Sequence, residues 1–138
     1  MPGMNARKMV LITNNPVCSA KLENDCVCIF DEAWNYGQVL QAALRKVEEG
    51  YFLVSHPMAG SLKPNQTPYL SVLLATSCIY SENDFDGAAV LEKAYAVYEK
   101  FQRQRPTPKW GPNIKKDFGT IDLSIMQGVM GRKGATVL

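Results

Sequence analysis

The 138-residue chain has the length of one ordinary domain, so two independent cores are not expected. Its 15 Lys and Arg residues against 13 Asp and Glu residues give a formal charge of only +2, with the single His counted as neutral. Dedicated nucleic-acid-binding domains usually carry a clear basic excess, so this balance argues against that class. A hydrophobic fraction of 46% with 20% charged residues is typical of globular proteins and excludes disordered and fibrous chains.

The sequence also argues against membrane insertion and export. The longest stretch without a charged residue runs from Pro64 to Ser81, and it is interrupted by Pro68 and several polar residues. A membrane-spanning helix needs about 20 mainly apolar residues. The N-terminal residues are polar and the apolar run after Lys8 is shorter than that of a signal peptide. We therefore expect a cytoplasmic protein.

Apolar runs and helix-period stripes alternate along the chain, separated by turn signals. The most distinctive helix begins at Asn35, a good N-cap, with Gln38 placed three residues later to bond back to it. Gly50 is expected to end this helix, because the residue after a helix often adopts the left-handed conformation, which favours glycine. In chain order, the sequence predicts a strand at 8–13, a helix at 16–23, a strand at 27–30, a helix at 35–50, strands at 51–54 and 70–76, a helix from 81–86 to about 103, a loop at 106–116 and a helix from about 120.

Strands that alternate with helices are typical of a mainly parallel sheet with helices on both faces. We therefore predict an α/β fold, a single three-layer domain at 8–130 with a small, mainly parallel sheet of about four strands. Residues 1–7 and 131–138 are expected to be flexible. In such sheets ligands bind beyond the carboxyl ends of the strands, which draws attention to the residues after the first and third strands.

The four cysteines, at positions 18, 26, 28 and 78, fit neither a disulfide framework nor a zinc site. Cys26 and Cys28 share one face of a predicted strand. They lack the Cys-x-x-Cys spacing, and no second pair or nearby His completes a metal site. In a reducing compartment, cysteines in apolar runs are mostly small buried hydrophobes. We therefore predict no metal site and no cofactor.

The connection between the third and fourth predicted strands is long and has an unusual composition. It runs from Ser55 to Tyr69, whereas connections in compact domains usually have about four to six residues. Three prolines and Gly60 indicate that this loop has a defined shape. It opens with His56, the only histidine and the residue type that most readily exchanges a proton near neutral pH.

The polar groups of this loop predict a small-anion site. Backbone N–H groups and a hydroxyl at Gly60 and Ser61, together with the charge of Lys63, are suited to hold a carboxylate or phosphate oxygen. The residues after the first strand would face the same crevice if the first and third strands were neighbours. The candidate ligand-binding residues are Asn14, Asn15, His56, Gly60, Ser61, Lys63, Asn65 and Thr67.

Two segments carry a specific order of residues. They are Ile12-Thr13-Asn14-Asn15-Pro16 and His56-Pro57-Met58-Ala59-Gly60-Ser61-Leu62-Lys63-Pro64-Asn65-Gln66-Thr67-Pro68-Tyr69. Together they resemble the GrdX family, small proteins encoded with the glycine reductase system of amino-acid-fermenting anaerobic bacteria. The resemblance covers residues 8–76, with weaker support from Thr120-Ile121-Asp122-Leu123-Ser124.

The resemblance implies a metabolic setting more than a mechanism. Glycine reductase makes acetyl phosphate and ammonia by selenoprotein and thiol chemistry, and its known subunits are other proteins. No catalytic residue is carried over from the family, and the cysteines lie outside the matching segments. Components of glycine reductase are therefore the partners that the resemblance implies.

Two functions follow for the long loop. The first is an accessory or regulatory protein of glycine reductase metabolism that binds a small anion, phosphate or a carboxylate, in the loop. The second is a small enzyme that uses His56 as general acid or base, with Lys63 and Asn14 or Asn15 stabilising negative charge. The sequence leaves open whether the protein is an enzyme.

A third function belongs to a basic segment at 100–116, which contains Trp110 and no acidic residue. Basic residues near an aromatic ring can bind a phosphate backbone or an acidic partner. Charge runs in loops are more often only solvated, so nucleic acid is the less favoured partner. A small sheet with an exposed edge would also suit a homodimer. The basic residues are Lys100, Arg103, Arg105, Lys109, Lys115 and Lys116.

Overall fold

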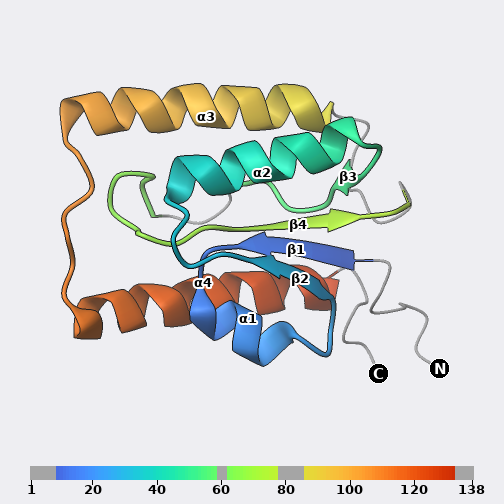
Figure 1. The fold of residues 1–138 in the computed structure, drawn as a ribbon, viewed down its shortest axis with the longest axis horizontal. Helices are drawn as coiled ribbons and strands as arrows, with labels where there is room; N and C mark the ends of the chain where they lie inside the picture. The colour runs from blue at the N-terminus through green and yellow to red at the C-terminus, as the bar shows by residue number, and fades with distance from the viewer. Residues whose placement is uncertain (1–8, 59–61, 78–85, 133–138) are drawn as a thin grey trace.

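A computed structural model describes residues 9–58, 62–77 and 86–132. In this part of the chain, four helices and a four-stranded open sheet form a mixed α/β fold (Figure 1). The candidates Gly60 and Ser61, Cys78, and residues 1–7 and 133–138 lie outside the described residues. Of the expected flexible end at 131–138, residues 131–132 belong to the last helix.

The helices and strands agree closely with the sequence predictions. Their bounds are β1 (Met9–Thr13), α1 (Pro16–Leu22), β2 (Val27–Phe30), α2 (Tyr36–Glu48), β3 (Phe52–Leu53), β4 (Ser71–Ala75), α3 (Gly87–Gln104) and α4 (Pro112–Arg132).

The sheet is mixed, so the prediction of a mainly parallel sheet was wrong. The strand order is β2-β1-β4-β3. The pair β1–β2 is parallel, whereas β4 runs antiparallel to both β1 and β3. The three strands joined by helices, β1, β2 and β3, therefore point the same way. The described residues of the connection from β3 to β4 form no helix that would carry the chain back across the sheet, so β4 returns antiparallel between β1 and β3.

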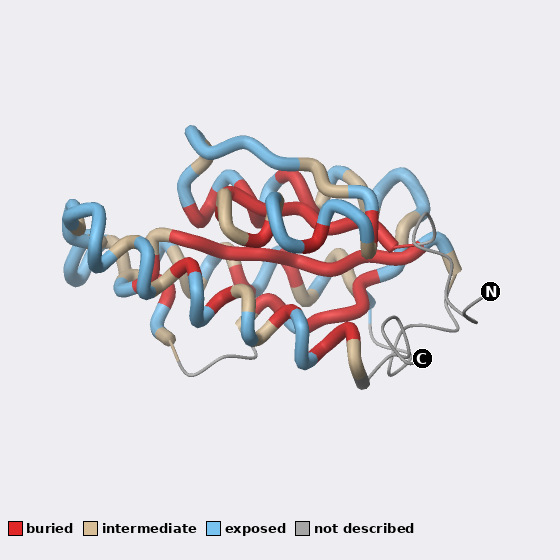
Figure 2. The backbone as a smooth tube through the Cα atoms, turned by 90° about the horizontal axis from the view of Figure 1, so that it is seen from below, coloured by how far each residue is buried: buried red, intermediate tan, exposed pale blue. Residues whose placement is uncertain are grey.

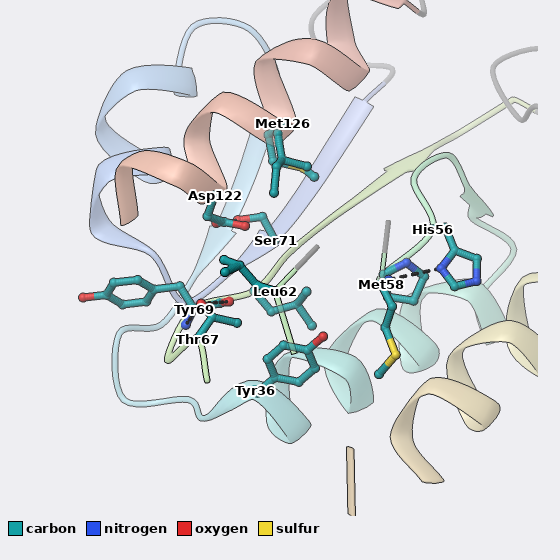
Figure 3. A pocket seen from close by; sticks show the side chains of 12 residues that line it. Tyr36, His56, Met58, Leu62, Thr67, Tyr69, Ser71, Asp122 and Met126 are labelled. Atoms are coloured by element: carbon teal, nitrogen blue, oxygen red, sulfur yellow. Dashed lines mark hydrogen bonds between the residues drawn. The ribbon is translucent and has the colours of Figure 1, made fainter. Parts of the chain in front are cut away.

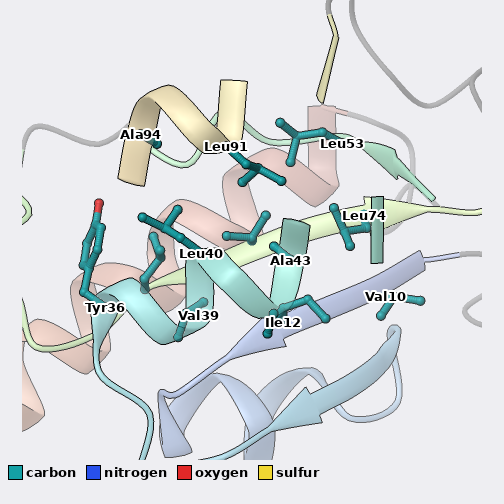
Figure 4. Close-up of a cluster of buried hydrophobic side chains, with 13 residues drawn as sticks. Val10, Ile12, Tyr36, Val39, Leu40, Ala43, Leu53, Leu74, Leu91 and Ala94 are labelled. Atoms are coloured by element: carbon teal, nitrogen blue, oxygen red, sulfur yellow. The ribbon is translucent and has the colours of Figure 1, made fainter. Parts of the chain in front are cut away.

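Helices lie on both sides of the sheet (Figure 1). Alternate residues of β1 and β4 face two separate apolar clusters. Ile12 and Leu74 pack against α2 and α3 (Figure 4). Leu11 and Leu73 pack against α1 and α4 on the other side. The two central strands are therefore buried along their whole length (Figure 2).

The predicted ends of α2 are confirmed. The Asn35 side chain accepts from Gln38 N at 2.8 Å, and Gln38 Oε1 accepts from Asn35 N at 2.9 Å, which completes a capping box. At the other end Gly50 has a φ of 110°, in the left-handed region. The bonds from Gly50 N to Val47 O and from Tyr51 N to Lys46 O then close the helix as a Schellman motif.

The last helix is longer than the sequence predicted. It begins at Pro112 rather than near residue 120, and it continues to Arg132. Proline lacks an N–H group and has a φ close to that of a helix, so it fits the first helical turn as well as it fits a loop. Residues 112–116 were therefore wrongly predicted to be a loop.

Gly37 allows α2 and α3 to pack closely. A Cβ atom at Gly37 would lie 2.6 Å from Tyr98 Cε2 and 3.1 Å from Tyr95 Cε1. Tyr98 has little room to move, because its ring stacks on Tyr36 with centroids 5.3 Å apart. We predict that Gly37→Ala lowers the free energy of unfolding by about 1–3 kcal/mol in urea denaturation. Gly111→Ala, where a Cβ has nothing within 4 Å, is the control for open space; because Gly111 directly precedes α4, where Ala is a poorer N-cap than Gly, this change should cost no more than about 1 kcal/mol. Equal stabilities of the two variants would contradict this account.

Candidate functional site

A buried polar cluster lies where β1 ends and β4 begins. Asp122 of α4 is at its centre, and its Oδ2 atom accepts three hydrogen bonds. The donors are Ser71 Oγ at 2.6 Å, Asn15 Nδ2 at 3.0 Å and Cys18 Sγ at 3.4 Å. Ser71 Oγ also lies 2.7 Å from Thr13 Oγ1. The cluster thus joins β1, α1, β4 and α4.

Burial dominates the chemistry of Asp122. Only 6% of the residue is exposed, and desolvation raises the pKa of its carboxyl group above the ordinary value. The hydrogen bonds from Ser71, Asn15 and Cys18 oppose this shift but do not cancel it. Burial, followed by the nearby carboxylate, also raises the pKa of Cys18, so this thiol is a poor source of thiolate.

A small pocket of about 40 Å³ adjoins Asp122 (Figure 3). This volume admits roughly two or three water molecules. No Lys or Arg is among the described residues that line it, so neither cation balances the carboxyl group of Asp122 there. Side chains that line it include Tyr36, His56, Met58, Leu62, Thr67, Ser71, Asp122 and Met126.

His56 lies at the exposed rim of this pocket. Its Nδ1 accepts a hydrogen bond from Met58 N at 3.1 Å, so the neutral ring carries its proton on Nε2. Figure 3 shows the imidazole apart from Asp122 and Ser71. The structure thus places His56 at the pocket but bonds its ring to its own loop.

Asn14 is a buried structural residue. Its Nδ2 donates to Trp34 O and Pro68 O, both at 2.9 Å. Its Oδ1 accepts from Leu70 N, also at 2.9 Å. The amide therefore ties the end of β1 to the chain before α2 and to the end of the long loop.

Asn15 is also buried and is the N-cap of α1. Its Oδ1 accepts from Val17 N at 3.0 Å, while its Nδ2 donates to Gly119 O at 2.9 Å as well as to Asp122. Both asparagines thus have their side chains engaged inside the protein. Neither is among the residues that line the pocket beside Asp122.

Thr67 and Asn65 shape the second half of the long loop. Thr67 Oγ1 bonds to the backbone of Tyr69, accepting from its N and donating to its O. Asn65 Nδ2 donates to Arg105 O at 2.9 Å and to Phe101 O at 3.5 Å. Asn65 therefore satisfies carbonyl groups at the C-terminal end of α3.

A second cleft, of about 290 Å³, lies between this half of the loop and the end of α3. Lys63 and Arg105 are both exposed and both line it, and no acidic residue is among the described residues that do so. The loop is held here by hydrogen bonds from Trp110 Nε1 to Gln66 O and from Gln102 Nε2 to Pro64 O. We call this the Lys63/Arg105 cleft; its lining residues are Lys63, Asn65, Gln66, Phe101, Gln104, Arg105, Pro108 and Trp110.

Comparison with known proteins decides the family. A family model described as GrdX-like protein matches residues 10–131, which include the long loop, both clefts and Asp122. The chain belongs to the GrdX-like family. No curated protein and no solved structure is significantly similar to it.

The basic segment of this GrdX-like protein is divided between α3, the link to α4 and the first turn of α4. Its aromatic residue, Trp110, packs against Phe118 with ring centroids 5.7 Å apart. Lys115 lies over the ring of Tyr69, 5.8 Å from its centroid.

No helix of the described part of the chain has the length and apolar character needed to cross a membrane.

Sequence reasoning did not identify Asp122 as a site residue, and it named Arg105 only as part of the basic segment at 100–116. Asp122 precedes Met126, Val129 and Met130 by four, seven and eight positions, and all four are buried. An acidic residue on the buried stripe of a helix was the available signal. No sequence signal linked Arg105 to Lys63, because only folding brings the two residues to one cleft.

Proposed function

We propose that this GrdX-like protein is an accessory or regulatory protein of glycine reductase metabolism that binds a small anion in the Lys63/Arg105 cleft. The observation that carries the proposal is the convergence of two cationic side chains from segments 42 positions apart on one cleft without acidic lining. Cationic donors make the stronger, shorter hydrogen bonds to phosphate and carboxylate oxygens. In this proposal, components of glycine reductase are the partners that respond when the protein has bound its anion.

The two halves of the long loop differ in the ligand that they favour. The His56 half adjoins a pocket with a buried carboxyl group and little volume. The Lys63 half adjoins a cleft about seven times larger, by the ratio of 290 to 40 Å³, with two positive charges. A phosphate or acetate ion is therefore better accommodated at the Lys63 half.

Asn65 contributes to this preference indirectly. The C-terminal end of a helix carries partial negative charge on its last carbonyl groups, which repels anions. Asn65 Nδ2 donates to two such carbonyls of α3. The amide therefore reduces the repulsion that an anion beside Arg105 would meet.

Titration calorimetry with inorganic phosphate, acetyl phosphate and acetate tests the proposal. We expect the intact protein to bind at least one of these anions at constant ionic strength. Lys63→Ala and Arg105→Ala should each weaken binding by about tenfold or more, because a hydrogen bond to a charged group contributes about 1.5–3 kcal/mol. Lys93→Ala removes an equal charge from an exposed position of α3 outside the cleft, so it should change affinity little.

Two results would count against the proposal. One is the absence of binding of all three anions. The other is an equal loss of affinity in Lys93→Ala and Lys63→Ala, which would indicate only a general effect of net charge.

A small enzyme is the second candidate, favoured by one observation. His56 and Asp122 line the same pocket, and the carboxyl group has a raised pKa, as general acids often do. Phosphorus NMR of acetyl phosphate incubated with the protein tests this function. Turnover that is lost in His56→Gln would support it, and turnover unaffected by that substitution would exclude His56 as the acid or base.

A further inference from the structure

Two cysteine side chains meet at the start of β2, away from both loop sites; Cys26 directly precedes the strand and Cys28 is its second residue. The Sγ atoms of Cys26 and Cys28 lie 3.9 Å apart and form a hydrogen bond. Residues two apart in a strand project to the same face, which is why these thiols are neighbours. Both cysteines are free; Cys26 is buried and Cys28 is partly exposed.

The pair is open to molecules from solution. β2 is an edge strand, next to β1 alone in the strand order. A groove of about 650 Å³ runs beside it, and both Cys26 and Cys28 line this groove with residues of α1 and with Phe30. A small reagent in the groove therefore reaches the more exposed thiol, Cys28.

The two thiols have different acidities. The hydrogen bond from Cys26 lowers the pKa of Cys28, although burial and the charges of Glu23 and Asp25 oppose this effect. The same contact, followed by burial, raises the pKa of Cys26. Cys28 is therefore the thiol that ionises first and attacks a substrate, and Cys26 is the thiol that reacts second.

We propose that Cys26 and Cys28 form a dithiol site that reduces small disulfides and becomes a disulfide itself. The Cys28 thiolate attacks one sulfur of the substrate disulfide, forms a mixed disulfide and releases the first thiolate. Cys26 then loses its proton, and its thiolate attacks Cys28 Sγ and releases the second thiolate. The two released thiolates take up the two protons lost by the cysteines. Two protein thiols are thus oxidised and one substrate disulfide is reduced, with no other oxidant.

The position of the pair favours a reversible reaction. The two Sγ atoms must approach from 3.9 Å to about 2 Å when the bond forms. An edge strand can bend more easily than a central strand, because only one side of it is paired. A disulfide between residues two apart closes a small ring, and strained disulfides are readily reduced again.

Oxidised glutathione is the probe, and intact mass with peptide mapping is the measurement. All proteins carry Cys78→Ser, so that only three thiols remain. The full chain under native conditions should lose two hydrogen atoms and yield a linked peptide containing Cys26 and Cys28. Cys26→Ser should instead accumulate one glutathione on Cys28. Cys28→Ser should react at least about tenfold more slowly, because the remaining thiols, Cys18 and Cys26, are buried, and burial by itself raises the pKa of each.

Three results would overturn the proposal. The first is no oxidation of the native chain, a readout that requires no substitution within the pair. The second is a stable glutathione adduct on the chain that retains both Cys26 and Cys28. The third is reaction of Cys28→Ser at the rate of its parent. Circular dichroism of each variant shows that the compared proteins are folded, and Cys26→Ala provides a second, apolar replacement for the buried thiol.

Discussion

Replacing Asn14 with Ala is expected to destabilise the protein by about 3 kcal/mol, since each buried group left without a partner costs about 1–3 kcal/mol. The Asn14 amide makes three hydrogen bonds of 2.9 Å, with Leu70 N, Trp34 O and Pro68 O. The residue is only 1% exposed, so water does not replace these partners easily. One truncation therefore releases the long loop and the chain before α2 from the end of β1 together.

Urea denaturation measures this loss of stability, and two further variants test its cause. Asn24→Ala changes an exposed asparagine and should have little effect. Asn14→Asp keeps an acceptor for Leu70 N but places a carboxylate oxygen against two carbonyl oxygens, so it should destabilise at least as much as Asn14→Ala. A loss below about 1 kcal/mol in Asn14→Ala would mean that these bonds do not hold the loop.

Asp122→Asn is expected to stabilise the protein at neutral pH relative to the unsubstituted chain. The side-chain oxygen of Asn retains the acceptor for Ser71, Asn15 and Cys18, while the buried group can no longer ionise. Ionisation of Asp122 is unfavourable in the folded protein, because burial raises its pKa. The substitution therefore removes a charge that opposes folding at neutral pH.

The pH dependence gives the sign of this effect. Because the pKa of Asp122 is higher in the folded than in the unfolded chain, the folded protein binds more protons between the two values. The free energy of unfolding consequently falls as the pH rises from the ordinary value of 3.8 through the raised pKa. Asp122→Asn lacks this decline, so its advantage should grow over that interval and then level off. Urea denaturation of both proteins across this range measures the difference; a difference that is independent of pH, or that falls as the pH rises, would contradict the raised pKa.

The sequence predicts the local structure well and the direction of one strand poorly. Capping of α2 by Asn35 and Gln38, and its end at Gly50, depend on neighbouring residues and could be predicted from them. The direction of β4 depends on whether the connection before it crosses the sheet. The described residues of that connection form no helix, and the alternation of strands and helices in the sequence did not predict that β4 would therefore run antiparallel. The start of α4 at Pro112 was missed because proline suits both a loop and a first helical turn.

The site was predictable only where its residues are close in sequence. The composition of the long loop singled out His56 and Lys63, and both line cavities. The charged neighbours of these cavities come from distant parts of the chain: Asp122 belongs to α4, and Arg105 directly follows α3. The sequence predicts Asn14 and Asn15 as ligand groups, and the structure shows that both side chains make hydrogen bonds inside the protein. A buried structural amide and a binding amide look alike in a sequence.

Binding of an anion in the Lys63/Arg105 cleft is tested most directly by the indole N–H signals of the two tryptophans in a two-dimensional NMR spectrum. Trp110 lines the cleft and donates its indole N–H to Gln66 O, whereas Trp34 is not among the residues that line it. Replacing chloride by phosphate, acetyl phosphate or acetate at constant ionic strength should shift the Trp110 signal saturably for at least one anion and leave Trp34 in place. The same titration of Lys63→Ala should need about tenfold more anion. Signals that stay fixed for all three anions, or that move equally for both tryptophans, would contradict the proposed site.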